Sequence, residues 1–116
     1  MKQNKAISII LVEEATLRLD EIEKNESSEY KKVLKSVFNA IERLKTDPVF
    51  GIHIPHAYFP KKYLDKYDVN NLWKVNLIGF RRLLYTLQTS SIQIKVVILD
   101  IISHEEYDRI FGYRKR

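Results

Sequence analysis

The sequence has 116 residues, of which 45% are hydrophobic and 30% are charged, so we expect one soluble domain with its own core. It lacks cysteine, which excludes disulfide scaffolds, cysteine zinc sites and thiol nucleophiles. No stretch has the roughly 18–20 apolar residues of a membrane span and no signal peptide is evident, so we expect a cytoplasmic protein. The net charge of +5 lies wholly in residues 59–116, and such a basic half favours a polyanion or an acidic protein as partner.

The first half of the chain predicts one strand followed by two helices. Residues 6–12 are rich in isoleucine and form too short an apolar run for a stable helix, which favours a strand. Residues 14–24 repeat apolar side chains at helical spacing. A second helix, with a longer apolar stripe, begins at Ser27 or Ser28 and ends before Pro48, because the residue before a proline disfavours helical geometry.

A long irregular connection, rich in basic and aromatic residues, follows at residues 46–71. Within it Pro60 is suited to begin a short helix, because proline is tolerated in a first helical turn. That helix would align Tyr63 with Tyr67 on one face. A connection of this length in a compact domain is usually functional or ordered on its own account.

The second half predicts three consecutive strands and a closing helix. Residues 72–77 and 82–87 alternate apolar and polar side chains, and Gly79 suits the turn between them. Residues 92–102 are apolar on both faces at their centre, as expected of an interior strand. A helix over residues 104–111 closes the domain; Ser103 caps its start and Gly112 ends it.

These elements give the order β-α-α-loop-β-β-β-α in a single domain, residues 1–116, with a basic tail at residues 113–116. Consecutive strands with short turns pair in antiparallel fashion. We therefore predict an α+β fold: one antiparallel sheet, two flanking N-terminal helices and a short C-terminal helix. Helices then cover one face of the sheet and leave the other face open and basic.

Three segments resemble motifs of the RelE/ParE superfamily of toxins. Residues 73–87 join a basic strand and a glycine turn to the sequence Arg-Leu-Leu-Tyr, and residues 96–107 form an apolar strand followed by a histidine and a tyrosine. Residues 44–51 resemble the junction after the second helix of the family. No single motif is specific; the resemblance lies in their order and spacing, and it covers the whole chain at the level of element order.

The resemblance implies a RelE-like toxin of a type II toxin–antitoxin system. Such a toxin is an mRNA interferase, a hydrolase that cleaves mRNA on the ribosome without metal or other cofactor. It inhibits translation until a cognate antitoxin neutralises it. The partners implied are therefore the antitoxin, mRNA and the ribosome, with no membrane partner. Residues 1–116 would form one RelE-like domain, whose oligomeric state the sequence leaves open.

Metal-free RNA cleavage needs a base for the 2′-OH, an acid for the leaving oxygen and fixed positive charge at the phosphate. The resemblance places Arg82, His104, Tyr107 and Lys74 as catalytic residues. Arg82 and Lys74 would hold phosphate, His104 would transfer protons since its ordinary pKa is near neutrality, and Tyr107 would orient the substrate. Structural roles are the alternative: a surface ion pair, a solvated lysine, a local hydrogen bond and a core tyrosine.

Four further basic residues are predicted to bind RNA. Arg81 points to the opposite face from Arg82, so a one-residue change of register would exchange the two roles. The other three, Lys61, Lys62 and Lys66, interleave with aromatic residues of the connection. Such a combination suits contacts with the RNA backbone together with base stacking. Aromatic residues that hold the connection down are the structural alternative.

Departures from the family pattern keep a second reading open. Asn76 stands where some members have a basic residue, and Glu105 and Glu106 follow His104 where many members carry another positive charge. Two carboxylates repel RNA, although either one is also a possible base. The alternatives are a non-catalytic RelE-fold module that binds RNA or an acidic antitoxin-like protein, and a ParE-like poison of DNA gyrase.

A metal site is not expected. His53 and His56 lie three residues apart, and Asp100 or His104 would have to complete the ligand set. The proline at position 55 prevents the regular helical spacing that would bring the two histidines together, and no cysteine assists.

Overall fold

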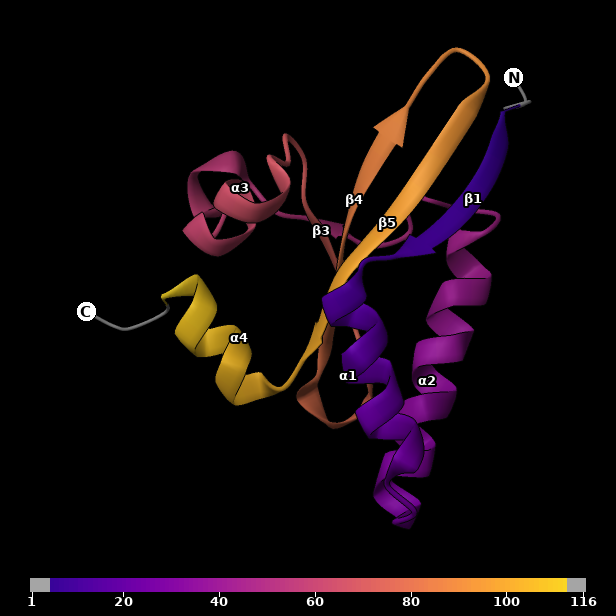
Figure 1. Ribbon diagram of the computed structural model, residues 1–116, viewed down its shortest axis with the longest axis vertical. Helices are drawn as coiled ribbons and strands as arrows, with labels where there is room; N and C mark the ends of the chain where they lie inside the picture. Colours follow the sequence, from indigo (N-terminus) through magenta and orange to yellow (C-terminus); the bar gives the residue numbers. More distant parts are fainter. Residues whose placement is uncertain (1–4, 113–116) are drawn as a thin grey trace.

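The computed structural model describes residues 5–112, which form a five-stranded sheet and four α-helices (Figure 1). The strands are β1 (Ala6–Leu11), β2 (Ile52–His53), β3 (Trp73–Asn76), β4 (Arg82–Thr89) and β5 (Gln93–Ile102). The helices are α1 (Glu13–Lys24), α2 (Ser28–Leu44), α3 (Lys61–Tyr67) and α4 (His104–Phe111), with short 3₁₀ turns η1 (His56–Tyr58) and η2 (Ile78–Phe80). The predicted α+β fold is confirmed. The predicted basic tail at residues 113–116 lies outside the described residues.

The sheet is mixed, which corrects the expectation of a wholly antiparallel one. Its order is β1-β5-β4-β3-β2; neighbours from β2 to β5 are antiparallel, whereas β1 runs parallel to β5. Short turns force antiparallel pairing only between consecutive strands. Because two helices separate β1 from the remaining strands, its direction is not constrained by a hairpin, and it completes the sheet beside the last strand.

The helices α1 and α2 cover one face of the sheet (Figure 1). Helix α2 begins where predicted, since the Ser27 side chain accepts a hydrogen bond from the Tyr30 N–H at 3.2 Å. Its apolar stripe packs against inward-facing residues of the central strands. The buried set on this face includes Val33, Val37, Leu44, Leu83, Tyr85, Val96 and Ile98.

The opposite face is also covered, which corrects the expectation of an open basic face. Part of the long connection, including α3, and helix α4 bury a second core, formed by Ile54, Phe59, Tyr63, Val69, Leu72, Leu84, Val97, Leu99, Ile102 and Tyr107. An interior strand that is apolar on both sides exposes hydrophobic area unless both faces are covered. The long connection supplies that cover. Its helix α3 follows Pro60 as predicted.

The start of the connection is fixed by one buried hydroxyl group. The Tyr85 hydroxyl donates to the Pro48 carbonyl at 2.8 Å and accepts from the Gly51 N–H at 3.0 Å. Burial raises the pKa of Tyr85 to about 12, so the hydroxyl keeps its proton and both bonds at neutral pH. Space at Gly51 is tight: a Cβ there would lie 2.7 Å from the Lys74 carbonyl oxygen and from the Tyr85 hydroxyl. Among the described residues, no helix is long and apolar enough to cross a membrane.

Candidate functional site

Three of the four predicted catalytic residues meet on one face of the sheet. Arg82 pairs with Asn76 and Lys74 pairs with Leu84, so the two basic side chains emerge on the same side. Lys74 Nζ donates to the Tyr107 hydroxyl at 2.8 Å, and Arg82 Cζ lies 4.7 Å from the centre of the Tyr107 ring. A cation close to an aromatic ring is stabilised by the electron density of that ring. The arrangement therefore holds two positive charges around one tyrosine; we call Lys74, Arg82 and Tyr107 the cationic cluster.

Tyr107 is a buried support, with 2% of its surface exposed. Helix α4 presents it because Ser103 and Glu106 form a reciprocal capping box at the first turn, as the sequence predicted for Ser103. The ring stacks on Phe111, with 4.4 Å between the ring centres. A ring so enclosed cannot stack on a base. Its position suits it to orient Lys74 and Arg82.

Arg82 has hydrogen-bonding capacity that the fold does not use. Its Nη1 donates to the Phe80 carbonyl at 2.6 Å, whereas its Nε is buried and makes no hydrogen bond within the described residues. A buried donor without an acceptor costs free energy.

Phe80 is a site residue to which the sequence analysis gave no role. It is 73% exposed, and it has a φ of 61°, directly after Gly79 with a φ of 74°. A positive φ costs a bulky residue about 1–3 kcal/mol and often marks a functional position. The turn holds the ring in solvent beside Arg82, 5.9 Å from the His104 ring centre. In the sequence, the feature that could have identified Phe80 was an aromatic residue immediately after the glycine of a turn.

His104, the predicted proton-transfer residue, lies at the rim of the cationic cluster. Half of its side chain, 51%, is exposed, and its Nε2 lies 3.4 Å from Asp108 Oδ2. Phe80 connects it to Arg82, because Phe80 contacts the histidine ring and accepts the arginine hydrogen bond. The structure thus places His104 beside the cationic cluster, at its solvent-facing side.

Arg81 lies on the opposite face of the sheet, as strand alternation predicted. Its Nη2 donates to the Tyr30 hydroxyl at 2.9 Å, and its guanidinium carbon lies 4.8 Å from the centre of the same ring. Arg81 therefore connects β4 to α2, away from the cationic cluster.

The three lysines predicted to bind RNA stand on α3 and face carboxylates. Lys61 Nζ lies 3.0 Å from Asp65 Oδ2, an exposed pair one helical turn apart. On α1, the Glu14 carboxylate pairs with both of the others: Lys62 Nζ lies 3.6 Å from its Oε2 and Lys66 Nζ lies 3.4 Å from its Oε1. These ion pairs offset part of the positive charge that the sequence pattern assigned to RNA. Glu14 was not recognised as their partner because it lies on a distant segment.

The sequence also did not predict a charged network, formed by Arg18, Asp100 and Glu106, that joins α1, β5 and α4. Asp100 is fully buried where β5 has an irregular register opposite Leu84 and Tyr85, and it accepts a hydrogen bond from the Tyr63 hydroxyl at 3.1 Å. Arg18 Nε lies 3.5 Å from it. Burial raises the pKa of Asp100 more than the nearby cations, first Arg18, lower it. The signal in the sequence was a single carboxylate inside a strand apolar on both faces.

Arg18 also holds α4 in place. Its two terminal nitrogens donate to the two carboxylate oxygens of Glu106 at 2.6 and 3.2 Å, a bidentate pair. Burial opposes ionisation of Glu106, but the hydrogen bonds from Arg18 and from the Ser103 N–H outweigh it, and the pKa of Glu106 is lowered. The helix that carries His104 and Tyr107 is thereby fixed to α1.

Glu106→Gln should lower the free energy of unfolding by about 1–2 kcal/mol at pH 7, since a partly buried charged hydrogen bond is lost. Because the pKa of Glu106 is lower in the folded than in the unfolded protein, its ionised form stabilises the fold at pH values above the unfolded pKa of about 4.3. This contribution to the free energy of unfolding disappears as the pH falls through the folded pKa. The difference between wild type and variant should therefore shrink on acidification. Urea unfolding from pH 7 to pH 3 measures it. The exposed neighbour serves as control: Glu105→Gln should change stability by under about 0.5 kcal/mol, and a pH-independent loss in Glu106→Gln would contradict the assignment.

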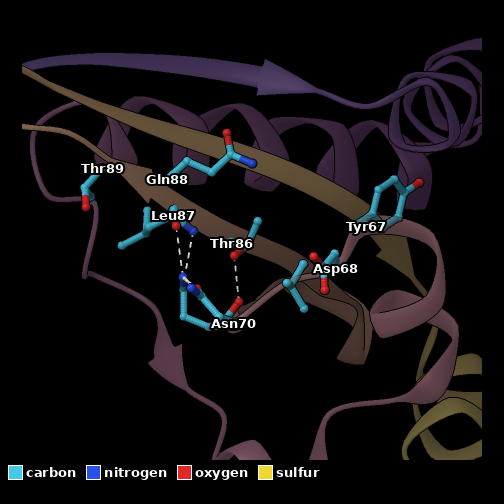
Figure 2. Close-up of a pocket in the computed structure, with 9 residues that line it drawn as sticks. Tyr67, Asp68, Asn70, Thr86, Leu87, Gln88 and Thr89 are labelled. Atoms are coloured by element: carbon cyan, nitrogen blue, oxygen red, sulfur yellow. Dashed lines mark hydrogen bonds between the residues drawn. The ribbon is translucent and has the colours of Figure 1, made fainter.

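A separate hollow of about 350 Å³ lies between the end of α3 and β4 (Figure 2). Two of its polar side chains are bound within the chain: the Asn71 amide bridges the backbone N–H and carbonyl of Leu87 at 2.8 and 2.9 Å, and the Thr86 hydroxyl donates to the Asn71 carbonyl at 2.6 Å. These bonds anchor the connection on β4. We therefore assign the hollow no ligand. Among residues 5–112, no three His, Asp or Glu side chains are grouped as metal ligands.

This arrangement, two helices on one face of a five-stranded sheet with a further helix after the last strand, is similar to the fold of a solved bacterial toxin. A particular relative in structure is the YoeB/ParE toxin from Agrobacterium tumefaciens, with a TM-score of 0.59 over 84% of this chain and 98% of that chain. The two sequences are 12% identical, so the likeness is one of fold. No protein-family model and no curated protein matches the sequence.

Proposed function

We propose that the protein is a toxin-like endoribonuclease that cleaves mRNA on the ribosome by metal-independent acid–base chemistry. The observation that carries the proposal is the cationic cluster. Lys74 and Arg82 are held around a buried ring, beside an exposed histidine, on the fold of a toxin. Two fixed positive charges suit the extra negative charge that builds up on a phosphate during attack by the 2′-OH. Arg82 donates from Nη1 to the Phe80 carbonyl, and the planar fork of its guanidinium suits a phosphate oxygen.

The chemistry requires two proton transfers. A base takes the proton of the 2′-OH, the resulting oxygen attacks phosphorus, and the 5′-oxygen leaves as it receives a proton from an acid. His104 is suited to one transfer because imidazole exchanges protons near neutral pH. Glu106 is not suited to the other, since Arg18 and Ser103 hold its carboxylate. Two other carboxylates lie near the histidine: Glu105, which is exposed and adjacent in sequence, and Asp108, whose Oδ2 lies 3.4 Å from His104 Nε2.

Phe80 extends the proposed site toward the bases. Its ring is exposed at the turn next to Arg82, so a base of single-stranded RNA would stack on it while Arg82 holds the adjacent phosphate. The ion-paired lysines of α3 would contribute less. A cognate antitoxin is the proposed inhibitor, and an acidic segment would suit the same cations.

Primer extension on mRNA loaded on ribosomes tests the proposal. The purified protein should cut within the codon in the decoding site, and Arg82→Ala should reduce cutting by at least about tenfold, since a charged contact to the reacting phosphate is lost. Arg81→Ala is the matched control, because its side chain lies on the other face and should retain cutting. Circular dichroism must show that both variants are folded. Equal activity of wild type and a folded Arg82→Ala would contradict the assignment.

A non-catalytic binding module is the second candidate, and one observation favours it. Asp108 faces His104 Nε2 at 3.4 Å, so the histidine is engaged by a carboxylate, with Glu105 beside it. A folded protein that binds RNA or an acidic peptide but cuts no ribosome-bound mRNA would support this candidate. Loss of DNA supercoiling in the same preparations would instead indicate a gyrase poison.

A further inference from the structure

Among residues 5–112, strand β1 leaves one long edge of the sheet open. It is the outermost strand beside β5, and its six residues, Ala6–Leu11, include no charge and no proline (Figure 1). The other edge strand, β2, has two residues. An uncharged edge of six residues presents a row of unpaired backbone groups, which is a template for a further strand. A two-residue edge offers too little length to serve in this way.

The hydrogen bonds to β5 determine which backbone groups remain available. The N–H groups of Ala6 and Val12 donate to Ile92 and Ile98 carbonyls of the β5 side, each at 3.1 Å. Backbone directions alternate along a strand, so even-numbered residues face β5. The N–H and C=O groups of Ile7, Ile9 and Leu11 are therefore directed at the open edge.

We infer that β1 pairs with β1 of a second copy of this chain, antiparallel, with Ile9 opposite Ile9. In a regular antiparallel pair, residues that direct their backbone groups outward must lie opposite one another. This condition excludes half of all registers. Centring on Ile9 pairs Ile7 with Leu11 and uses all three outward residues. Moving the centre to Ser8 would place Leu11 opposite Lys5, and moving it to Ile10 would place Ile7 opposite Glu13.

Charge and side-chain placement favour a second copy as the occupant. In an antiparallel pair, Lys5 before β1 of each copy lies at the end of the other copy's strand, where α1 begins with Glu13 and Glu14, so opposite charges come together at both ends of the pair. Ile10 is 40% exposed, and it would lie directly opposite Ser8 of the other copy. The segment is thus complementary to itself in backbone direction, apolar content and charge. The dimer would have one continuous ten-stranded sheet.

Cysteine cross-linking tests the register, because the native chain has no cysteine. Directly opposite residues without mutual hydrogen bonds have Cα atoms about 4.5 Å apart, within disulfide range. The Ser8→Cys/Ile10→Cys double variant should therefore oxidise to a covalent dimer at least about tenfold faster than either single variant. Equally fast cross-linking of Ser8→Cys or Ile10→Cys alone would overturn the register.

Sedimentation of the native chain tests the dimer itself. Twice the mass of one chain is expected, and Ile10→Lys should shift the equilibrium to the monomer, because it introduces charge at the centre of the pair. Val49→Lys, at a residue 57% exposed outside β1, is the matched control and should remain dimeric. A monomer at every concentration up to about 1 mM, or a dimer insensitive to Ile10→Lys, would overturn the inference.

Discussion

Tyr107→Ala is expected to lower the free energy of unfolding by about 3–5 kcal/mol, as is typical when a buried aromatic side chain is truncated. The ring is 2% exposed, lies against Phe111, and belongs to the core below the sheet. Its removal leaves a cavity and also withdraws the surface on which Lys74 and Arg82 rest. Urea unfolding at neutral pH measures the loss.

Tyr107→Phe separates the two contributions of the side chain. It retains the ring, so stability should fall by only about 1 kcal/mol through the hydrogen bond from Lys74. If Tyr107 orients the cations, cleavage by the folded Tyr107→Phe variant should decline through loss of this hydrogen bond, while Arg82 keeps its aromatic support. A loss of stability in Tyr107→Phe as large as in Tyr107→Ala would contradict a supporting role for the ring.

Gly51→Ala is expected to destabilise the protein by about 1–3 kcal/mol, the usual cost of forcing extra volume into a filled site. The added carbon would lie 2.7 Å from the Lys74 carbonyl oxygen, which is backbone and cannot move alone, and 2.7 Å from the Tyr85 hydroxyl. Lys74 belongs to the cationic cluster, so the displacement would reach the candidate site. Thermal unfolding together with the cleavage assay measures both effects.

Tyr85→Phe provides the matched comparison. It removes one of the three crowding atoms, the hydroxyl oxygen, and keeps the ring carbon 2.9 Å from the added Cβ. It also removes the bonds to Pro48 and Gly51, at an expected cost of about 1–3 kcal/mol. The double variant Gly51→Ala/Tyr85→Phe should be more stable than the sum of the single losses predicts, since the hydroxyl no longer opposes the new methyl group. Strict additivity would show that the hydroxyl group does not contribute to the cost, which would then come from the Lys74 carbonyl and the Tyr85 ring.

The parts of the fold that local patterns encode were predictable. Ser27 or Ser28 was predicted to cap the second helix and Ser103 the last one, from residue type and position; the Ser27 and Ser103 side chains accept the expected hydrogen bonds. The pairing of β1 was not predictable in the same way, because periodicity gives the faces of a strand but not its neighbour. The cover on the second face escaped prediction for a related reason: the connection has no regular period, and its apolar residues bury only in the context of the sheet.

The candidate site, too, was predictable only where local sequence patterns determine it. Strand alternation places Lys74 and Arg82 on one face only once the register of their two strands is known, and the sequence left that register open to a one-residue change. The burial of Tyr107 depends on how α4 docks, which a single helical turn does not encode. Asp100, Arg18 and Glu106 come from three separate elements, and their association is a property of the tertiary structure. The catalytic and RNA-binding roles themselves remain predictions for the experiments above.

The parallel pairing of β1 with β5 has a consequence for biosynthesis. Strand β1 leaves the ribosome well before β5 and must wait for it, because β5 begins about ninety residues later in the chain. Such pairings between distant segments are slow to form, since the intervening chain must be ordered first. Until then an isoleucine-rich segment without charge stays unpaired in the nascent chain, where it is vulnerable to aggregation and is a natural substrate for chaperones.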